Sequence, residues 1–163
     1  MYENIGLWST NSGTAPISRT PDVAAGPYGA LTADRITFNS NSAEGYFHPT
    51  NIPVVNGEIY TWSGFFKQDS NQTSIKLGPD ANPDSSFKVN PTDGSITTPP
   101  ANFIAYGVLD YGAGWFRAWC TVRATNIAWA FTSFNNGGVA NKSWLMGGIQ
   151  VDQGGLRPYR KDP

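Results

Sequence analysis

The side chains on which most enzyme chemistry depends are nearly missing from this chain of 163 residues. There is one histidine, His48, and one cysteine, Cys120, so a Ser–His–Asp triad would depend on a single imidazole and a zinc site would lack ligands. No glycine-rich phosphate loop follows a strand and opens a helix. Most acidic residues fall in predicted turns, whereas a glycosidase needs two carboxylates facing each other across a cleft. We therefore predict that the chain is not an enzyme and has no catalytic residues.

Charge is also scarce. Charged residues make up 14% of the chain and the formal net charge is −1, against about 25% charged residues in ordinary globular proteins. The basic stripe that a nucleic-acid backbone requires is absent, as is a polybasic membrane anchor. No segment approaches the roughly 20 apolar residues of a membrane span. We expect neither a nucleic-acid partner nor membrane insertion.

Aromatic residues and glycine are abundant instead, with 13% aromatics and 18 glycines. Helical spacing of apolar residues is missing, while short alternating runs are separated by turn residues. The sequence predicts one domain over residues 1–163, an antiparallel β-sandwich with little helix. Pro21–Gly29 is expected to be a loop and Asn90–Gly94 a tight turn. The predicted strands are Asn4–Ser9, Ala33–Asn39, Glu44–His48, Ile59–Gln68, Ser74–Leu77, Ser86–Val89, Ser95–Thr98, Phe103–Leu109, Trp115–Arg123, Ile127–Phe131 and Trp144–Val151.

The strand Trp115–Arg123 alternates strictly and so has two unlike faces. One face is apolar and suits a core, and it includes Cys120, which we interpret as a small core residue. The other face alternates large aromatic and cationic side chains, which suits a sugar ring or another protein surface. In Ile59–Gln68, Tyr60, Trp62 and Phe66 face one side and Thr61, Ser63, Phe65 and Lys67 the other.

These patterns predict a face that binds a glycan or a subunit, formed by Phe65, Lys67, Trp115, Arg117, Trp119 and Arg123. Phe65 and Trp119 are the strongest ligand candidates. The alternative for both is burial under a loop or a neighbouring subunit. Trp115 is expected to pack at a sheet edge. The core is predicted to hold Trp62, Phe66, Trp129 and Phe131.

Five segments, in order, resemble a jelly-roll domain of bacteriophage tail and virion proteins that is similar to a carbohydrate-binding module. Gly114-Trp115-Phe116-Arg117 is similar to the family's Gly-Trp-Tyr-Arg, and Ile59–Lys67 to its Tyr-Thr-Phe-Ser-Val-Tyr-Leu-Lys. The other three are Asn4–Ser9, like Asn-Leu-Leu-x-Tyr-Ser; Pro27–Ile36, like Pro-Asp-Gly-Thr-x-Thr-Ala-Asp-Lys-Leu; and Gly148–Gly154 with Arg157–Tyr159, like Gly-Ala-Gln-Leu-Glu-x-Gly with a Pro-Thr-x-Tyr tail.

The resemblance implies a structural protein of a phage particle, assembled in the host cytoplasm. It would be a decoration or cement protein of the capsid or tail, or a fibre tip. Since the likeness begins near Met1 and ends near the last residue, the sandwich surface itself is expected to hold the virion coat or tail proteins, or further copies of the chain, for which a cyclic trimer is one arrangement. The alternative is an adhesin that binds host-surface glycans. Such modules often hold a structural calcium ion, for which Asp22, Asp34 and Asp152 are candidate ligands. Their spacing matches no calcium motif, and no cofactor is predicted.

Overall fold

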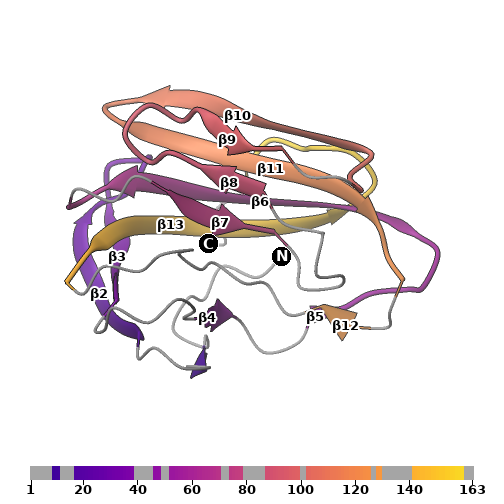
Figure 1. Ribbon diagram of the computed structural model, residues 1–163, viewed down its shortest axis with the longest axis horizontal. Coiled ribbons are helices and arrows are strands. Elements are labelled where there is room, and N and C mark those ends of the chain that lie inside the picture. The colour runs from indigo at the N-terminus through magenta and orange to yellow at the C-terminus, as the bar shows by residue number, and fades with distance from the viewer. Residues whose placement is uncertain are drawn as a thin grey trace.

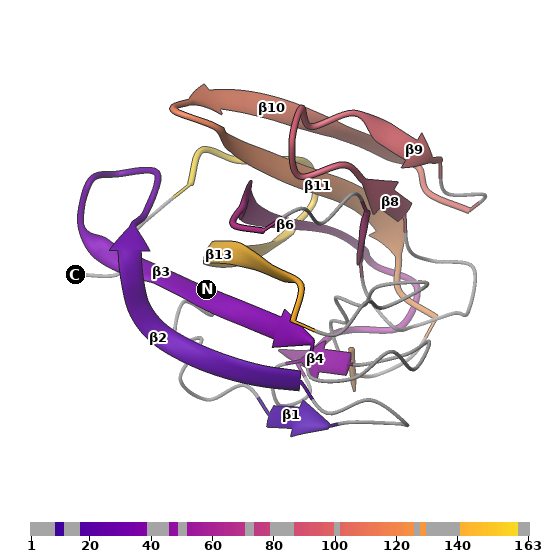
Figure 2. The same ribbon diagram turned by 60° about the vertical axis from the view of Figure 1, so that its left-hand side comes forward.

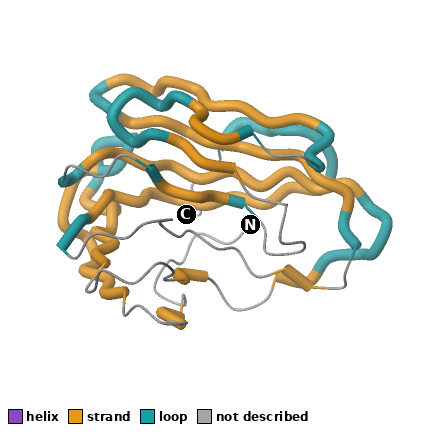
Figure 3. The backbone as a smooth tube through the Cα atoms, viewed as in Figure 1, coloured by secondary structure: helices purple, strands orange, loops and turns teal. Residues whose placement is uncertain are grey.

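The computed structural model describes residues 9–11, 17–38, 46–48, 52–70, 74–78, 87–99, 102–125, 128–129 and 141–159. All regular secondary structure in these residues is β-strand (Figure 3). None of the described segments is a helix long and apolar enough to cross a membrane.

The largest unit is a six-stranded antiparallel sheet, which runs through the middle of Figure 1. Successive side chains of its long central strands point to opposite sides, so the sheet has two faces that can each pack against another part of the protein. In spatial order its strands are β10 (Ala105–Gly112), β11 (Trp115–Arg123), β6 (Ile59–Gln68), β13 (Ser143–Gln153), β3 (Leu31–Phe38) and β2 (Ile17–Ala25).

A second layer covers one face of this sheet. It includes a three-stranded sheet of β7 (Ile75–Leu77), β8 (Phe87–Val89) and β9 (Ile96–Thr98), and Figure 2 shows β8 and β9 on one side of β11 and β6. Two short pairs complete the described strands. They are β1 (Ser9–Asn11) with β4 (Tyr46–His48), and β5 (Ile52–Pro53) with β12 (Ala128–Trp129). The arrangement is the predicted antiparallel β-sandwich.

The core lies between the two layers. Trp62 and Phe66 on β6 are buried there, as predicted, against side chains from both sheets. Cys120 lies fully inside, and burial raises the pKa of its thiol far above the ordinary value, so it is the inert core residue that its strand face predicted. The side chain of Trp129 and all of Phe131 lie outside the described residues.

Strands β6 and β11 have the predicted bounds, Ile59–Gln68 and Trp115–Arg123. The turn at Asn90–Gly94 is confirmed too: Gly94 adopts φ 72° and its N–H donates to the Asn90 carbonyl at 2.9 Å. Predicted strand Asn4–Ser9 lies outside the described residues except for Ser9, and Ile127–Phe131 is described only at 128–129.

The prediction of a loop over Pro21–Gly29 is wrong for its first half, because residues 21–25 belong to β2. Proline is tolerated there because β2 is the last strand of the sheet, where one side needs no hydrogen-bond donor. The pairing of β2 with β3 shifts between Thr20 and Ala24, and Asp22 in that bulge has φ 52°. An edge position and a bulge cannot be recognised from local composition alone.

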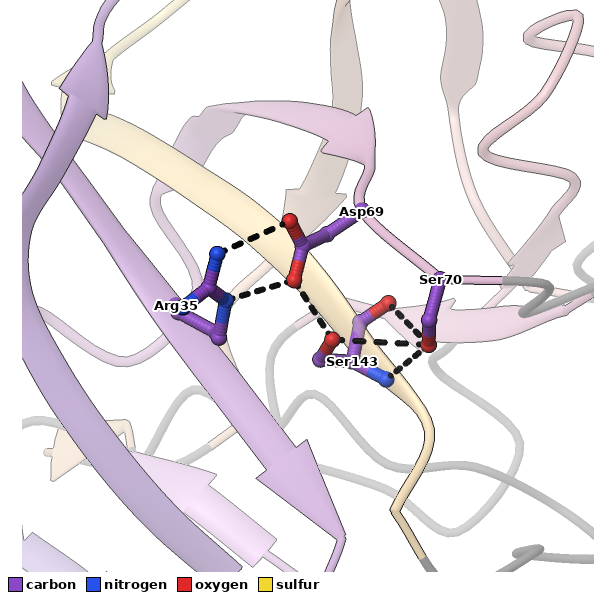
Figure 4. Close-up of polar contacts among 4 residues, drawn as sticks. All are labelled: Arg35, Asp69, Ser70 and Ser143. Atoms are coloured by element: carbon purple, nitrogen blue, oxygen red, sulfur yellow. Dashed lines mark hydrogen bonds and ion pairs between the residues drawn. The ribbon is translucent and has the colours of Figure 1, made fainter.

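A polar network ties three neighbouring strands together (Figure 4). Arg35 on β3 donates to both carboxylate oxygens of Asp69, at 2.6 and 3.2 Å, just after β6 ends. The Ser143 hydroxyl at the start of β13 donates to the same carboxylate at 2.6 Å. Ser70 exchanges backbone and side-chain bonds with Ser143. These bonds hold the pKa of Asp69 below its ordinary value, with the Arg35 hydrogen bond as the largest cause.

Candidate functional site

The side of the six-stranded sheet that faces away from the three-stranded sheet is called the outer face here. Every residue of the predicted binding face lies on it, because Phe65 and Lys67 on β6 alternate with the core residues of that strand, as do their counterparts on β11. The predicted division of both strands into two faces is confirmed. The structure does not, however, bring all of these residues together, nor does it leave all of them exposed.

Three of the six residues are covered. Phe65, Trp115 and Arg117 are 1%, 3% and 1% exposed, so none of the three presents its side chain to solvent. Trp115 is packed, as expected. Phe65 and Trp115 form a second small core with Ala33 and Leu145. For Phe65 this burial is the alternative that the sequence left open.

Tyrosines form the cover. Tyr28 comes from the β2–β3 turn, Tyr111 from the end of β10 and Tyr159 from the segment after β13. Figure 2 shows the β2–β3 and β10–β11 turns at the same upper left part of the molecule. The ring of Tyr111 meets the Phe65 ring edge-on at 4.9 Å, Tyr159 does the same at 4.9 Å, and Tyr28 stacks on Tyr159 at 5.2 Å with an interplanar angle of 8°. Tyr28 and Tyr111 remain 52% and 38% exposed.

The segment 154–159 lies along the outer face and is held at both ends. The Thr61 hydroxyl donates to the Gly154 carbonyl at 2.6 Å, and the buried Gln150 amide donates to the Pro158 carbonyl at 3.3 Å. Gly148 makes room for the Tyr159 ring, since a Cβ atom there would overlap the tyrosine hydroxyl. The position of Tyr159 is therefore fixed by the sheet beneath it.

Arg117 is a buried cation beneath this cover. Its guanidinium donates to the Ser63 hydroxyl at 2.8 Å and lies 5.6 Å from the Phe65 ring and 5.8 Å from the Tyr159 ring. Its Nε has no hydrogen-bond partner among the described residues, and no carboxylate among them pairs with it. Among the described residues, the Ser63 hydroxyl and the two aromatic rings are the groups that offset its charge.

Trp119 lies further along the same strand and is half-buried. Its partner on the edge strand β10 is Gly107, and a Cβ atom at that glycine would stand 2.9 Å from the indole Nε1. The indole therefore rests on the bare backbone of β10. Leu109, two residues on, is exposed on the same face. We call the set Tyr28, Leu109, Tyr111, Trp119 and Tyr159 the outer strip.

The two remaining predicted residues differ in position. Lys67 is half-buried beside the strip, where its ammonium donates to the Ala113 carbonyl at 2.6 Å. Arg123 is exposed and donates to the Gly57 carbonyl at 2.6 Å. It lies eight residues from Trp115 along β11, about 26 Å away. Arg123 is thus separated from the other candidates.

Sequence reasoning missed the tyrosines of the outer strip. Tyr28 and Tyr159 lie outside the alternating strands, so the pattern that assigned the other residues to faces could not orient them. One signal was present. Both fall within segments that carry the family resemblance, next to Pro27 and Pro158.

The carboxylates of two of the three candidate calcium ligands, Asp34 and Asp152, form hydrogen bonds within the protein. Asp34 is buried and pairs with Arg19, and its second oxygen accepts from the Asp22 backbone N–H at 3.1 Å. Asp152 accepts from the Gln150 amide. In the described segments no three acidic, histidine or cysteine side chains gather as a metal site would require.

Comparison with known proteins supports the fold. No family model and no curated sequence matches the chain. Among solved structures, the xylan-binding CBM22-1 domain of Paenibacillus barcinonensis Xyn10C aligns over 90% of this chain and 85% of its own length, with TM-score 0.51 and 13% identity. The CBM22-1 and GH10 modules of Clostridium thermocellum endo-1,4-β-D-xylanase 10B, complexed with xylohexaose, align over 98% of this chain, with TM-score 0.55 and 14% identity.

A third similar structure is the enzymatically active domain of tailspike protein 4 from bacteriophage CBA120, with 93% of this chain aligned, TM-score 0.50 and 15% identity. This chain spans 28% of the xylanase structure and 20% of the tailspike structure. At such identities the likeness concerns the fold. The protein is an all-β antiparallel sandwich that resembles carbohydrate-binding modules.

Proposed function

We propose that this protein is a non-enzymatic glycan-binding module that uses the outer strip. The observation that carries the proposal is the cluster of tyrosines around Phe65, where rings in contact with the buried Phe65 ring remain partly exposed. An aromatic ring with one open face offers a flat apolar surface to a sugar ring, and its hydroxyl or indole N–H offers a hydrogen bond. Exposed aromatic clusters of this kind mark binding sites more often than ordinary surface.

The strip has the length for an oligosaccharide. Trp119 and the turn beside Tyr111 are separated by about four residues of strand, roughly 13 Å. Because the tyrosines are held by one another and by the sheet, little side-chain entropy is lost on binding. A shallow site of this kind is expected to be weak, about millimolar, and to function through several copies.

Two similarities support the proposal. A structure of similar fold is named for xylan binding, and another was solved with xylohexaose. The tailspike likeness and the five-segment resemblance favour a bacteriophage particle as the setting. We therefore propose a virion location, with a host-surface glycan as the ligand.

The test is a glycan array and a xylohexaose titration with the protein displayed as a tetramer on streptavidin. Trp119→Ala and Tyr111→Ala should each abolish detectable binding. Tyr106→Ala is the matched control, since Tyr106 is on the same strand as Tyr111, is equally exposed at 39%, and lies on the opposite face. Equal losses for Tyr106→Ala and Tyr111→Ala, or binding that survives both strip variants, would refute the outer strip as the site.

A subunit contact at β10 is the second candidate function, and it corresponds to the structural role in a particle. β10 ends the order of the six-stranded sheet, and Tyr106 and Leu109 are exposed on it, as is Ile104 just before it. Its sequence contains no lysine or arginine, the residues that commonly protect an edge strand from pairing. We propose that β10 pairs with β10 of a second copy, in a two-fold contact.

Light scattering over a concentration series tests this contact. The wild type should associate, and Tyr106→Lys should remain a monomer, because a charge on the edge opposes pairing. Tyr111→Ala should associate like the wild type. A wild type that stays monomeric at all concentrations would exclude the contact without affecting the glycan proposal.

A further inference from the structure

An open pocket lies at the other end of the sheet from the tyrosines. Strand β6 begins here and strands β11 and β13 end here, on the right of Figure 1. The pocket has a volume of about 360 Å³, and its polar side chains are Glu58, Arg123, Gln153 and Arg157. It includes Arg123, the predicted binding residue that lies apart from the other five.

The walls of this pocket are fixed by backbone hydrogen bonds. Gly57 N–H donates to the Ala124 carbonyl at 2.8 Å, Ala124 N–H to the Glu58 carbonyl at 2.8 Å, and Gly154 N–H to the Ile59 carbonyl at 2.8 Å. Gly57 and Gly154 have φ of 86° and 87°, a conformation that other residues rarely adopt. Neither would bring a Cβ within 4 Å of another atom, so the space beside both is open.

The charges of the pocket favour an anion. Arg123 uses one guanidinium nitrogen to hold the Gly57 carbonyl, and no carboxylate of the described segments pairs with it or with Arg157. The single acidic side chain, Glu58, accepts a hydrogen bond from the Gln153 amide at 3.2 Å. Two guanidinium groups without a carboxylate partner present planar forks that match a carboxylate ion.

We propose that this pocket binds an acidic sugar, a hexuronate or similar carboxylated residue. The carboxylate is recognised by Arg123 and Arg157, and the sugar hydroxyls by the Glu58 carboxylate and the Gln153 amide. Inorganic phosphate would gain from the arginines, but it is too compact to offer separate hydroxyls to both Glu58 and Gln153 while its charge meets the arginines. The combination of two cations, one acceptor and one amide therefore fits a carboxylated polyol better than phosphate. This site is distinct from the outer strip and does not depend on it.

The test is a titration of the intact chain, followed by amide NMR shifts, with methyl glucuronide, methyl glucoside and inorganic phosphate as separate probes. Methyl glucuronide should bind about tenfold more tightly than methyl glucoside, because the guanidinium groups form charge-assisted hydrogen bonds with its carboxylate. The shifts should fall on residues 57–59 and 153–157, and raising the salt should weaken the binding.

Arg157→Ala should remove most of this preference. It is the primary variant because Arg157 is exposed and makes no described hydrogen bond that the fold would lose. Arg123→Lys keeps the positive charge but lacks the planar guanidinium group, and it should lose part of the preference for glucuronide. Lys88→Ala on β8 is the charge control and should bind like the wild type.

Equal affinity for glucuronide and glucoside, competition by phosphate at the same concentration, or an equal loss in Lys88→Ala would overturn the proposal. Tyr111→Ala separates the two sites. If it abolishes xylohexaose binding and leaves the glucuronide shifts unchanged, both proposals hold. If the glucuronide shifts alone are missing in the wild type, only the acidic-sugar pocket fails.

Discussion

The two faces of the six-stranded sheet are both buried near its centre, but by different chemistry. On the inner face, Trp62, Phe66 and Trp144 pack in an apolar layer with side chains of the three-stranded sheet. On the outer face, the neighbouring positions hold Ser63, Arg117 and Gln150, which are equally buried but are covered by tyrosines and by the segment 154–159. One alternating pattern thus specifies a core on one side and a supported binding surface on the other.

Burial has different effects on stability at the two faces. Apolar burial on the inner face lowers the free energy of the folded state directly. Burial of Arg117 on the outer face carries a desolvation cost that hydrogen bonds and aromatic rings only offset. A buried cation retained at such a cost is more readily explained by the surface it supports than by folding. The predictions below test this division.

The largest effect is expected on the inner face. Trp62→Ala should lower the free energy of unfolding by about 3–5 kcal/mol, because it leaves a cavity among rigid neighbours. Urea denaturation measures the loss. Leu31→Ala is the control, since Leu31 is an exposed apolar residue and should change stability by less than about 0.5 kcal/mol. An unaltered midpoint for Trp62→Ala would mean that the two faces of β6 have been assigned in reverse.

Gly148→Ala should have a smaller effect, confined to the outer face. The added Cβ would overlap the Tyr159 hydroxyl, so the ring must leave its position against Phe65, Tyr28 and Arg117. The lost ring contacts should cost about 1–2 kcal/mol, with a change in the near-ultraviolet circular dichroism of the tyrosines. Gly155→Ala is the matched control because a Cβ there would contact nothing within 4 Å. Equal behaviour of the two variants would show that Tyr159 does not rest on Gly148.

The sequence predicted which face of the sheet a residue lies on, but not which residues of the outer face are buried. The strict alternation of Trp115–Arg123 and Ile59–Gln68 placed every residue of those strands on the correct face, including buried Trp62 and Cys120. Exposure on the outer face did not follow, because it depends on which distant segment covers the sheet. Tyr28 and Tyr159 are separated by 131 positions in sequence yet stack on one another, and no local pattern encodes that contact. The bulge in β2 escaped prediction for the same reason.

Arg117→Met should change stability by about 1 kcal/mol or less in either direction. The variant removes the hydrogen bond to Ser63 and two ring contacts, but it also removes the desolvation cost of a charge without a described carboxylate partner. Replacing Ser63 by Ala instead would leave the guanidinium buried with one partner fewer, and should cost about 1–3 kcal/mol. The opposite result, in which Ser63→Ala is harmless and Arg117→Met unfolds the protein, would show that the cation itself stabilises the fold.

The smallest effect concerns the network at the edge of the outer face. Bonds from Arg35 and Ser143 lower the pKa of Asp69, so its carboxylate contributes stability above the unfolded-state pKa near 4 and loses it as the pH falls through the lower folded-state value. Asp69→Asn should therefore be less stable than the wild type at pH 7, by at most about 1 kcal/mol because the Arg35 side chain is 41% exposed and the pair is screened by solvent. That difference should shrink in urea titrations repeated below about pH 4 and approach zero once the wild-type carboxyl is protonated.

Thr92→Ala, far from the network in the β8–β9 turn, should show no such pH-dependent difference. A gap between wild type and Asp69→Asn that stays constant from pH 7 to pH 2 would mean that the network acts through the shape of the side chain and not through its charge.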